Sequence, residues 1–221
     1  MRGFAGPALA VLIFCGCASV FAQETKPEGE GTTTTAGGTT RVIIGAGLGG
    51  ASNAKIKVNG QSVTFGDIFQ GSTDDTPTVA VKVATFGIAL KPGFYAGLDL
   101  TGIGKAGNVP STPGQTDKTA VQIIDYFGML TWFPWESGPF LKAGAGLSTF
   151  AVAVNSNGST DTTHASGLGL LLGAGFALQL SGAHHITLSV EQTWQSYGGS
   201  SSTKPDSSQF TSVFLGYLYK N

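Results

Sequence analysis

The chain has 221 residues, enough for one ordinary domain with a small extension. Charged residues make up only 11% of it, less than half of the roughly 25% of typical soluble domains, and glycine supplies 34 residues. The formal net charge of −1 gives no reason to expect a nucleic-acid partner. The chain is too apolar for an ordinary soluble surface. It is also too rich in glycine for a helical protein, because each interior glycine costs about 1 kcal/mol relative to alanine.

The first 22 residues have the layout of a secretory signal peptide. A basic residue is followed by an apolar run from Ala8 to Cys17, and a small-residue pattern ending at Ala22 predicts cleavage before Gln23. The alternative is a lipoprotein signal acylated at Cys17, although the residues ahead of that cysteine lack the usual leucine. Both cysteines lie in residues 1–22, so cleavage there predicts a mature chain without disulfides or cysteine-bound metal.

Residues 23–40 are polar and of low complexity, so we expect a flexible periplasmic linker there. The next stretch, RVIIGAGLGG at 41–50, places Gly45, Gly47 and Gly50 at the spacing of a dinucleotide-binding turn. Such a turn must open a helix, but the following residues show no apolar stripe at helical spacing. We therefore interpret the stretch as a first strand whose glycines face a narrow interior and leave space for larger groups there.

The clearest alternation lies in SGLGLLLGAGFALQL, residues 166–180, where leucines share one parity and glycines the other. This period of two predicts a strand with one apolar face. A transmembrane helix is the competing interpretation, but residues 168–180 would extend only about 20 Å as a helix, short of a hydrocarbon core of about 30 Å. As a strand tilted by about 45° they cover roughly 30 Å, which suits the apolar band of a membrane barrel.

Strand-like segments recur along the whole chain, and a bulge is one cause of the phase change within 78–90. The segments are 41–50, 78–90, 94–101, 118–132, 140–153, 166–180, 185–197 and 209–220. Short turns at 91–93, 133–138 and 181–184 alternate with long polar loops at 52–75, 106–117, 154–165 and 198–208. This alternation predicts an all-β fold: an eight-stranded antiparallel up-and-down transmembrane β-barrel over residues 41–221, with both termini in the periplasm.

Six charged side chains must point into this barrel if its apolar faces meet lipid, because a charge facing lipid at the midplane costs about 2–4 kcal/mol. They are Arg41, Lys82, Asp99, Asp125, Lys142 and Glu191. An eight-stranded barrel is just wide enough to be filled by side chains. We therefore expect these three bases and three acids to form a paired network that plugs the interior, with Arg41 the member expected to reach water at a strand end.

Aromatic residues gather near the predicted strand ends, as they do in the two girdles of membrane barrels. The expected members are Phe94, Tyr95, Trp132, Phe133, Trp135, Phe140, Tyr217 and Tyr219 toward the periplasm, and Phe150, Trp194, Tyr197 and Phe210 toward the outside. Aromatic residues are common in strands of every kind, so this distribution only supports the barrel.

Residues 41–221 resemble the small outer-membrane barrels of the OmpX and OmpA transmembrane-domain type, mainly in architecture. The local motif is the C-terminal strand FTSVFLGYLYKN, in which Gly216 and Tyr219 match the assembly signal of such barrels and the terminal Asn221 departs from it. The resemblance implies residence in the cell outer membrane, contact with its lipids, and assembly by the barrel-assembly machinery.

We expect a monomeric, non-enzymatic protein without cofactor or metal. Its exposed loops, 52–75 especially, would carry a structural, adhesive or protective role.

Two other functions stay open. His164 and Ser166 are similar to the H-x-S pair of outer-membrane lipid A deacylases, in which the histidine is the base for a nucleophilic serine. Asp161 is near enough in sequence to orient that histidine, although the pair lies farther from the C-terminus than in that family. The second is a narrow pore, against which the predicted charge-filled interior argues. The adjacent His184 and His185 point to opposite faces of a strand, so we expect no metal site there.

Overall fold

The computed structural model describes residues 41–72, 77–112, 115–135, 137–156, 159–198 and 204–221. The expected signal peptide at 1–22 and linker at 23–40 lie outside the described residues. Within the described part of the chain, no helix is long and apolar enough to cross a membrane.

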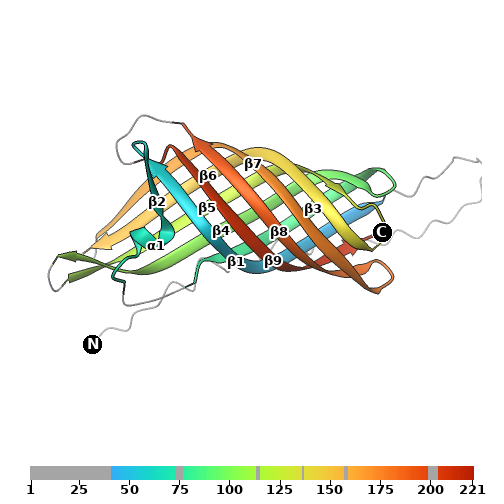
Figure 1. Ribbon diagram of the computed structural model, residues 1–221, viewed down its shortest axis with the longest axis horizontal. Helices are drawn as coiled ribbons and strands as arrows, with labels where there is room; N and C mark the ends of the chain where they lie inside the picture. The colour runs from blue at the N-terminus through green and yellow to red at the C-terminus, as the bar shows by residue number, and fades with distance from the viewer. Residues whose placement is uncertain (1–40, 73–76, 113–114, 136, 157–158, 199–203) are drawn as a thin grey trace, which may run out of the picture. The chain divides into compact units, whose positions relative to one another are not determined.

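Eight long strands form a closed antiparallel ring (Figure 1). They are β1 (Val42–Val58), β3 (Val79–Lys91), β4 (Phe94–Thr112), β5 (Gln115–Trp132), β6 (Gly138–Ser156), β7 (Ser159–Ser181), β8 (His184–Tyr197) and β9 (Ser207–Lys220). Each pairs with the next strand of the ring, which closes where β1 pairs with β9, for example Ile44 with Tyr219. The short strand β2 (Gln61–Thr64) pairs with the end of β1. The predicted eight-stranded up-and-down barrel is therefore confirmed.

The two ends of the barrel differ, and we name them by what they carry. The terminal end carries the start of β1, the end of β9 and the short turns that follow β3, β5 and β7. The loop end carries the turn between β1 and β2, where Asn59 and Gly60 have φ angles of 51° and 79°. Positive φ at both central residues of an Asn-Gly pair is the geometry of a tight hairpin turn.

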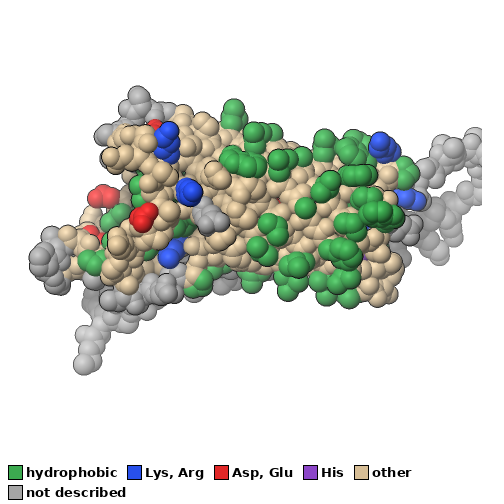
Figure 2. Space-filling view, viewed as in Figure 1, with side chains coloured by type: hydrophobic (Ala, Val, Ile, Leu, Met, Phe, Trp, Pro, Cys, Tyr) green, Lys and Arg blue, Asp and Glu red, His purple; other side chains and the backbone are tan. Residues whose placement is uncertain are grey.

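Side chains alternate between the outside of the barrel and its interior. On β4, the Leu98 side chain is 66% exposed, whereas its neighbour Asp99 is 1% exposed. Figure 2 shows hydrophobic side chains gathered over the part of the barrel toward the terminal end, with few over the part toward the loop end. An apolar outer band around charged interior side chains is the reverse of a soluble protein and is typical of a membrane barrel.

The phase change predicted within β3 is a bulge. The register of β3 against β4 shifts between Lys82 and Ala84. Lys82 and Thr85 are both buried in the interior although they are three residues apart, which a regular strand forbids. One extra residue restores the alternation, and Val83 takes a place on the outside. The bulge is thus what turns Lys82 inward.

The glycines on the inner face serve two purposes. At Gly45 on β1, a β-carbon would lie 2.8 Å from the carbonyl oxygen of Tyr217, so glycine permits the close approach of the β9 backbone. At Gly173 on β7, a β-carbon would lie 2.9 Å from Cγ of Glu191. The expectation that glycines leave space for larger interior groups is met at Gly173, whereas at Gly45 the close neighbour is backbone.

Three of the predicted loops are wrong, and in the first, 52–75, β1 continues to Val58. Residues 106–117 and 154–165 were expected to be long and polar, but most of them are strand: Ala106 pairs with Ala120, and Asn155 pairs with Thr160. Ladder hydrogen bonds join backbone groups, so a run of small and polar residues remains a strand where its partner continues beside it. As a result, β4 to β7 extend beyond the apolar band at the loop end.

A short helix, α1 (Phe65–Ile68), lies within the segment 52–75, where the sequence predicted a loop. Thr64 caps it: the Asp67 amide donates to Thr64 Oγ1 at 3.1 Å, and the Thr64 amide donates to Asp67 Oδ2 at 2.8 Å. Phe65 and Phe69 are buried against the barrel interior at the loop end. Residues 59–72, from the turn through the helix, are called the lid segment below.

The capping bonds give a prediction for the lid segment. The backbone amide and the hydroxyl of Thr64 both stabilise the charged carboxylate, so the pKa of Asp67 lies below its ordinary value of 3.8. A carboxyl whose pKa is lowered on folding stabilises the folded state above its unfolded pKa and loses that effect as the pH falls through the folded pKa. We expect a ¹³C NMR titration of the Asp67 carboxyl to give a midpoint below 3.8. A midpoint at or above that value would show that the cap does not form.

Candidate functional site

Four charged side chains meet in the barrel interior. Lys142 Nζ lies 2.6 Å from Asp99 Oδ2 and 3.1 Å from Glu191 Oε1. Lys82 Nζ pairs with the same Glu191 oxygen and lies 3.6 Å from Asp99 Oδ2. Each lysine therefore contacts both acids. We call Lys82, Asp99, Lys142 and Glu191 the charge cluster; its members come from β3, β4, β6 and β8, so it links strands from around the ring.

Neighbouring groups complete the charge cluster. Thr85 Oγ1 donates a hydrogen bond to Asp99 Oδ1 at 2.8 Å. The Lys82 ammonium lies 4.6 Å from the centroid of the Phe214 ring, within cation–π range. Two ammonium groups face two carboxylates, so the charges balance within the cluster. Balance matters because an unpaired charge in a dry interior is far more costly than a paired one.

Asp125 lies apart from the charge cluster and belongs to a separate hydrogen-bonded group. Gln195 Nε2 donates to Asp125 Oδ2 at 3.1 Å, and Gln195 Oε1 accepts from Ser208 Oγ at 2.7 Å. The Tyr197 hydroxyl lies 2.8 Å from Ser208 Oγ. Among the described residues, the other oxygen of Asp125 has no hydrogen-bond partner. Asp125 is therefore held through the Gln195 amide, which the Ser208 and Tyr197 hydroxyls position in turn.

Arg41 lies at the terminal end, just before β1, with an exposed side chain. Its backbone carbonyl accepts a hydrogen bond from the Ala89 amide at 2.8 Å. The structure thus brings together four of the six charged residues that the sequence placed inside. It puts Asp125 in a second interior group and Arg41 at the rim.

Apolar clusters fill the interior on both sides of the charge cluster. Along β4, the inward-facing Tyr95, Asp99 and Ile103 follow one another from the terminal end toward the loop end. The terminal-end cluster consists of Ile43, Tyr95, Met129, Phe133, Phe140, Ala177 and Leu218. The loop-end cluster includes Ile56, Phe65, Phe69, Ile103, Val121, Ile123, Phe150, Phe210 and Phe214. A cavity of about 40 Å³ beside Lys82, Lys142 and Glu191 has room for only a few waters.

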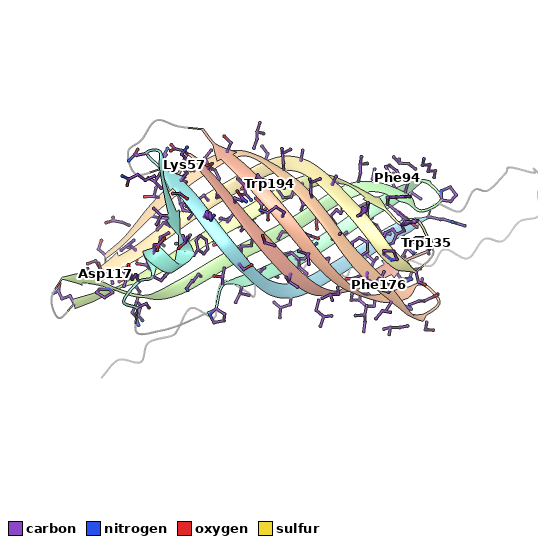
Figure 3. All side chains as sticks on the ribbon, viewed as in Figure 1. Lys57, Phe94, Asp117, Trp135, Phe176 and Trp194 are labelled. Carbon is purple, nitrogen blue, oxygen red and sulfur yellow. The ribbon has the colours of Figure 1, made fainter. Side chains whose placement is uncertain are left out.

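Half of the predicted aromatic girdle is wrong. Phe94, Trp132, Tyr217 and Trp194 lie on the outside, and Trp135 is exposed in the turn after β5. Figure 3 shows Phe94, Trp135 and Phe176 near the terminal end. Side chains expected in the girdles are instead buried in the interior; they are Tyr95, Phe133, Phe140, Phe150, Tyr197 and Phe210. The prediction used position along the strand but ignored parity, which decides the face. These six rings pack the two apolar clusters.

The H-x-S pair faces outward. His164 and Ser166 are exposed and share the outer face of β7 with Leu168 and Leu170. Among the described residues, no hydrogen bond joins His164 to Ser166 or to Asp161. The arrangement therefore shows a serine and a histidine on one face without the oriented base that nucleophilic catalysis needs.

The adjacent histidines point to opposite faces, as the alternation predicted. His184 is exposed on the outside, where Nδ1 pairs with the Tyr217 hydroxyl. His185 is buried inside the terminal end, with Nδ1 3.0 Å from the Ala183 carbonyl oxygen. Within the described part of the chain, no three His, Cys, Asp or Glu residues are grouped as metal ligands.

The polar partners of the buried acids were not among the predicted interior residues. Thr85 bonds to Asp99, Gln195 bonds to Asp125, and Ser208 bonds to Gln195. Threonine, glutamine and serine are also common in surface loops. The available signal was parity: Gln195 lies four residues after Glu191 on β8, so both must face the same side. Extending the alternation from the charged residues to every polar residue would have placed Gln195 inside.

The chain is similar in structure to several solved proteins. It covers 99% of Ail, the attachment invasion locus protein of Yersinia pestis, solved with the heparin analogue sucrose octasulfate, at 12% identity and a TM-score of 0.48 over 82% of this chain. It covers 97% of Neisserial surface protein A at 13% identity and a TM-score of 0.43, again over 82% of this chain. It covers 96% of the outer membrane protein OprG from Pseudomonas aeruginosa at 15% identity and a TM-score of 0.44, over 82% of this chain.

Neither the protein-family models nor the curated proteins give a match. The closed ring of β1 and β3 to β9 has, by its own strand order, the architecture implied by the resemblance to the OmpX and OmpA transmembrane-domain type.

Proposed function

We propose that this protein is a monomeric, integral outer-membrane β-barrel without enzymatic activity. Its loop end would stand outside the cell in a structural, adhesive or protective role. The observation that carries the proposal is the inverted polarity of the ring. Leu168, Leu170 and Leu172 are more than half exposed, while Asp99 and Glu191 are almost fully buried. Such a surface is stable in lipid and would aggregate in water.

The loop end supports a role in contact with the surroundings. Beyond Leu168 on β7, the outward residues become Ser166, His164, Thr162 and Thr160, and the strand continues to Ser159. Nine residues of strand tilted by about 45° rise about 20 Å above the apolar band. A paired sheet holds this extension stiffly, which suits a surface that meets other molecules better than a set of loose loops would.

The filled interior supports a closed barrel over a pore. The charge cluster and the two apolar clusters leave a cavity of about 40 Å³ beside Lys82. In planar bilayers, we expect the purified protein to show no steady single-channel openings. Steady openings would overturn the closed barrel while leaving the membrane location intact.

The outward H-x-S pair supports a structural surface over a lipid A-modifying enzyme. We expect lipid A from cells with the intact protein and from cells with Ser166→Ala to have the same mass spectrum. Loss of a deacylated species in Ser166→Ala cells alone would show that Ser166 and His164 catalyse the reaction.

The last strand carries the features by which this barrel would itself be assembled. Gly216 and Tyr219 lie on β9, the strand that closes the ring against β1. We propose that the barrel-assembly machinery engages β9 before closure, and that outer-membrane lipids are the other partners of the band.

Cysteine labelling tests the orientation, because cleavage after Ala22 leaves no native thiol. A membrane-impermeant maleimide added to intact cells is expected to label Thr162→Cys, which lies on the extension. Trp135→Cys at the terminal end should react only after the envelope is opened, and Leu170→Cys in the apolar band only after denaturation. The unheated protein should also migrate differently from the heated one in electrophoresis. A protein in the soluble fraction, or labelling of Trp135→Cys first, would overturn the proposal.

A further inference from the structure

The terminal end contains a concavity that the proposed function does not use. It has a volume of about 590 Å³, within the range of small-molecule sites, and we call it the terminal cup. Its lining includes Arg41, Tyr95, Phe133, Trp135, His185 and Lys220. The turns after β3, β5 and β7 form its rim, and Figure 3 shows Trp135 at that end of the barrel.

The floor of the terminal cup is closed by aromatic rings. The Tyr95 and Phe133 rings meet edge to face with centroids 5.8 Å apart, and the Phe133 and Phe140 centroids are 5.1 Å apart. Both contacts have the spacing of favourable aromatic pairs. These buried rings close the cup on the side of the barrel interior.

Two cationic side chains, Arg41 and Lys220, line the terminal cup. Arg41 precedes β1 and Lys220 ends β9, and the pairing of Ile43 with Lys220 brings these two chain ends together. The Lys220 ammonium lies 4.5 Å from the centroid of the Phe133 ring, on the inner side of the barrel. None of the described lining residues is acidic. A guanidinium and an ammonium beside aromatic walls suit an anion on an apolar body, because the arginine fork matches a carboxylate or a phosphate.

His185 adds a fixed polar group. A carbonyl oxygen can only accept, so the contact of His185 Nδ1 with the Ala183 oxygen requires that Nδ1 carries a proton. This bond fixes the orientation of the ring in the wall of the cup, where it is buried. The wall of the cup thus contains an oriented imidazole beside the two cations.

We propose that the terminal cup binds a small organic anion, in which a carboxylate or phosphate engages Arg41 and Lys220 while a ring packs on Trp135, whose side chain is exposed. The assignment rests on the lining of the cup and is independent of the role proposed for the loop end. It also does not require passage through the barrel, because the charge cluster and the loop-end cluster lie beyond the floor.

The test uses ¹⁹F NMR on the full mature chain in detergent micelles. The probes are 4-fluorobenzoate and 4-fluorophenyl phosphate, with neutral 4-fluorobenzamide as the matched control. We expect at least one of the two anions to show saturable line broadening that the amide lacks, and protein-free micelles to give none. Equal broadening by the anions and the amide, or no saturable broadening by either anion, would overturn the proposal.

Variants at the same end of the barrel sharpen the test. Arg41→Gln with Lys220→Gln should weaken anion binding at least tenfold, because each removes a charge that faces the ligand. Lys91→Gln removes a cation at this end that lies over Phe94, 5.4 Å from the ring centroid, and does not line the cup. The affinity of Lys91→Gln for the anionic probes should stay within twofold of that of the parent protein. An equal loss in Lys91→Gln would show that only the general charge of this end attracts the probe. The heat-dependent shift in electrophoresis verifies that each variant is folded.

Discussion

Replacing Asp99 with Asn is expected to lower the free energy of unfolding by about 3–5 kcal/mol, the usual cost of removing one partner from a buried ion pair. Asp99 contacts both lysines of the charge cluster, 2.6 Å from Lys142 and 3.6 Å from Lys82. After the substitution, two ammonium groups share the single carboxylate of Glu191. The surplus positive charge lies among side chains that are almost fully buried, so the barrel must bear much of its desolvation cost. Equilibrium unfolding in urea, from lipid vesicles or detergent, measures the difference.

Asp125→Asn is the matched control, because Asp125 is equally buried and undergoes the same chemical change. The Asp125 carboxylate accepts a hydrogen bond from the Gln195 amide at 3.1 Å, and an asparagine oxygen accepts that hydrogen bond as well. No lysine loses a partner, so we expect a change of about 1 kcal/mol or less, on the scale of a single neutral hydrogen bond. Equal losses in the two variants would mean that the interior does not distinguish a paired acid from an unpaired one, and the balance of the charge cluster would then have no energetic meaning.

The fold could be predicted because the two faces of every strand in the apolar band meet different surroundings. The outer face meets lipid, and the inner face meets the packed side chains of the interior. Leu170 faces outward, and its neighbours Gly169 and Leu171 face inward. Residue types therefore alternate along the strand with a period of two, which can be seen in the sequence. The bulge next to Lys82 was also predictable, because the alternation in 78–90 breaks at one point. Charged residues follow the same rule. A lysine or aspartate has only one tolerable side in the apolar band, and this is why Lys82, Asp99, Lys142 and Glu191 could be placed inside from sequence.

The predictions failed where the difference between lipid and interior does not constrain the sequence. Beyond the apolar band, the outer face meets water, so residues such as Thr162 and Asn155 look like loop while they remain paired in strands. The buried rings of Phe140 and Phe150 were misplaced because an aromatic side chain suits both the interior and the membrane interface. Pairing partners such as Gln195 and Asp125 are set by how the strands stagger around the ring. One strand's sequence carries no information on that stagger.

The largest local effect is expected in the lid segment, where Phe65→Ala with Phe69→Ala should release residues 59–72 from the barrel. Both rings are almost fully buried in the loop-end cluster, and a buried phenylalanine replaced by alanine typically costs about 3–5 kcal/mol. Phe69 also lies under the Lys105 ammonium, 5.3 Å from its ring centroid, so the variant loses that contact as well.

The lid segment contacts the rest of the barrel chiefly through these rings and the four-residue pairing of β2 with β1, so we expect it to open locally while the ring stays closed. Hydrogen–deuterium exchange should accelerate at least 100-fold in peptides covering 61–72, since about 2.7 kcal/mol of lost local stability corresponds to that factor. Peptides covering 168–180 should exchange as in the parent protein, and Gln70→Ala, on the exposed side of the same segment, should leave both unchanged. Faster exchange in 168–180 would show that the lid is part of the cooperative barrel, and unchanged exchange in 61–72 would show that the rings do not hold it.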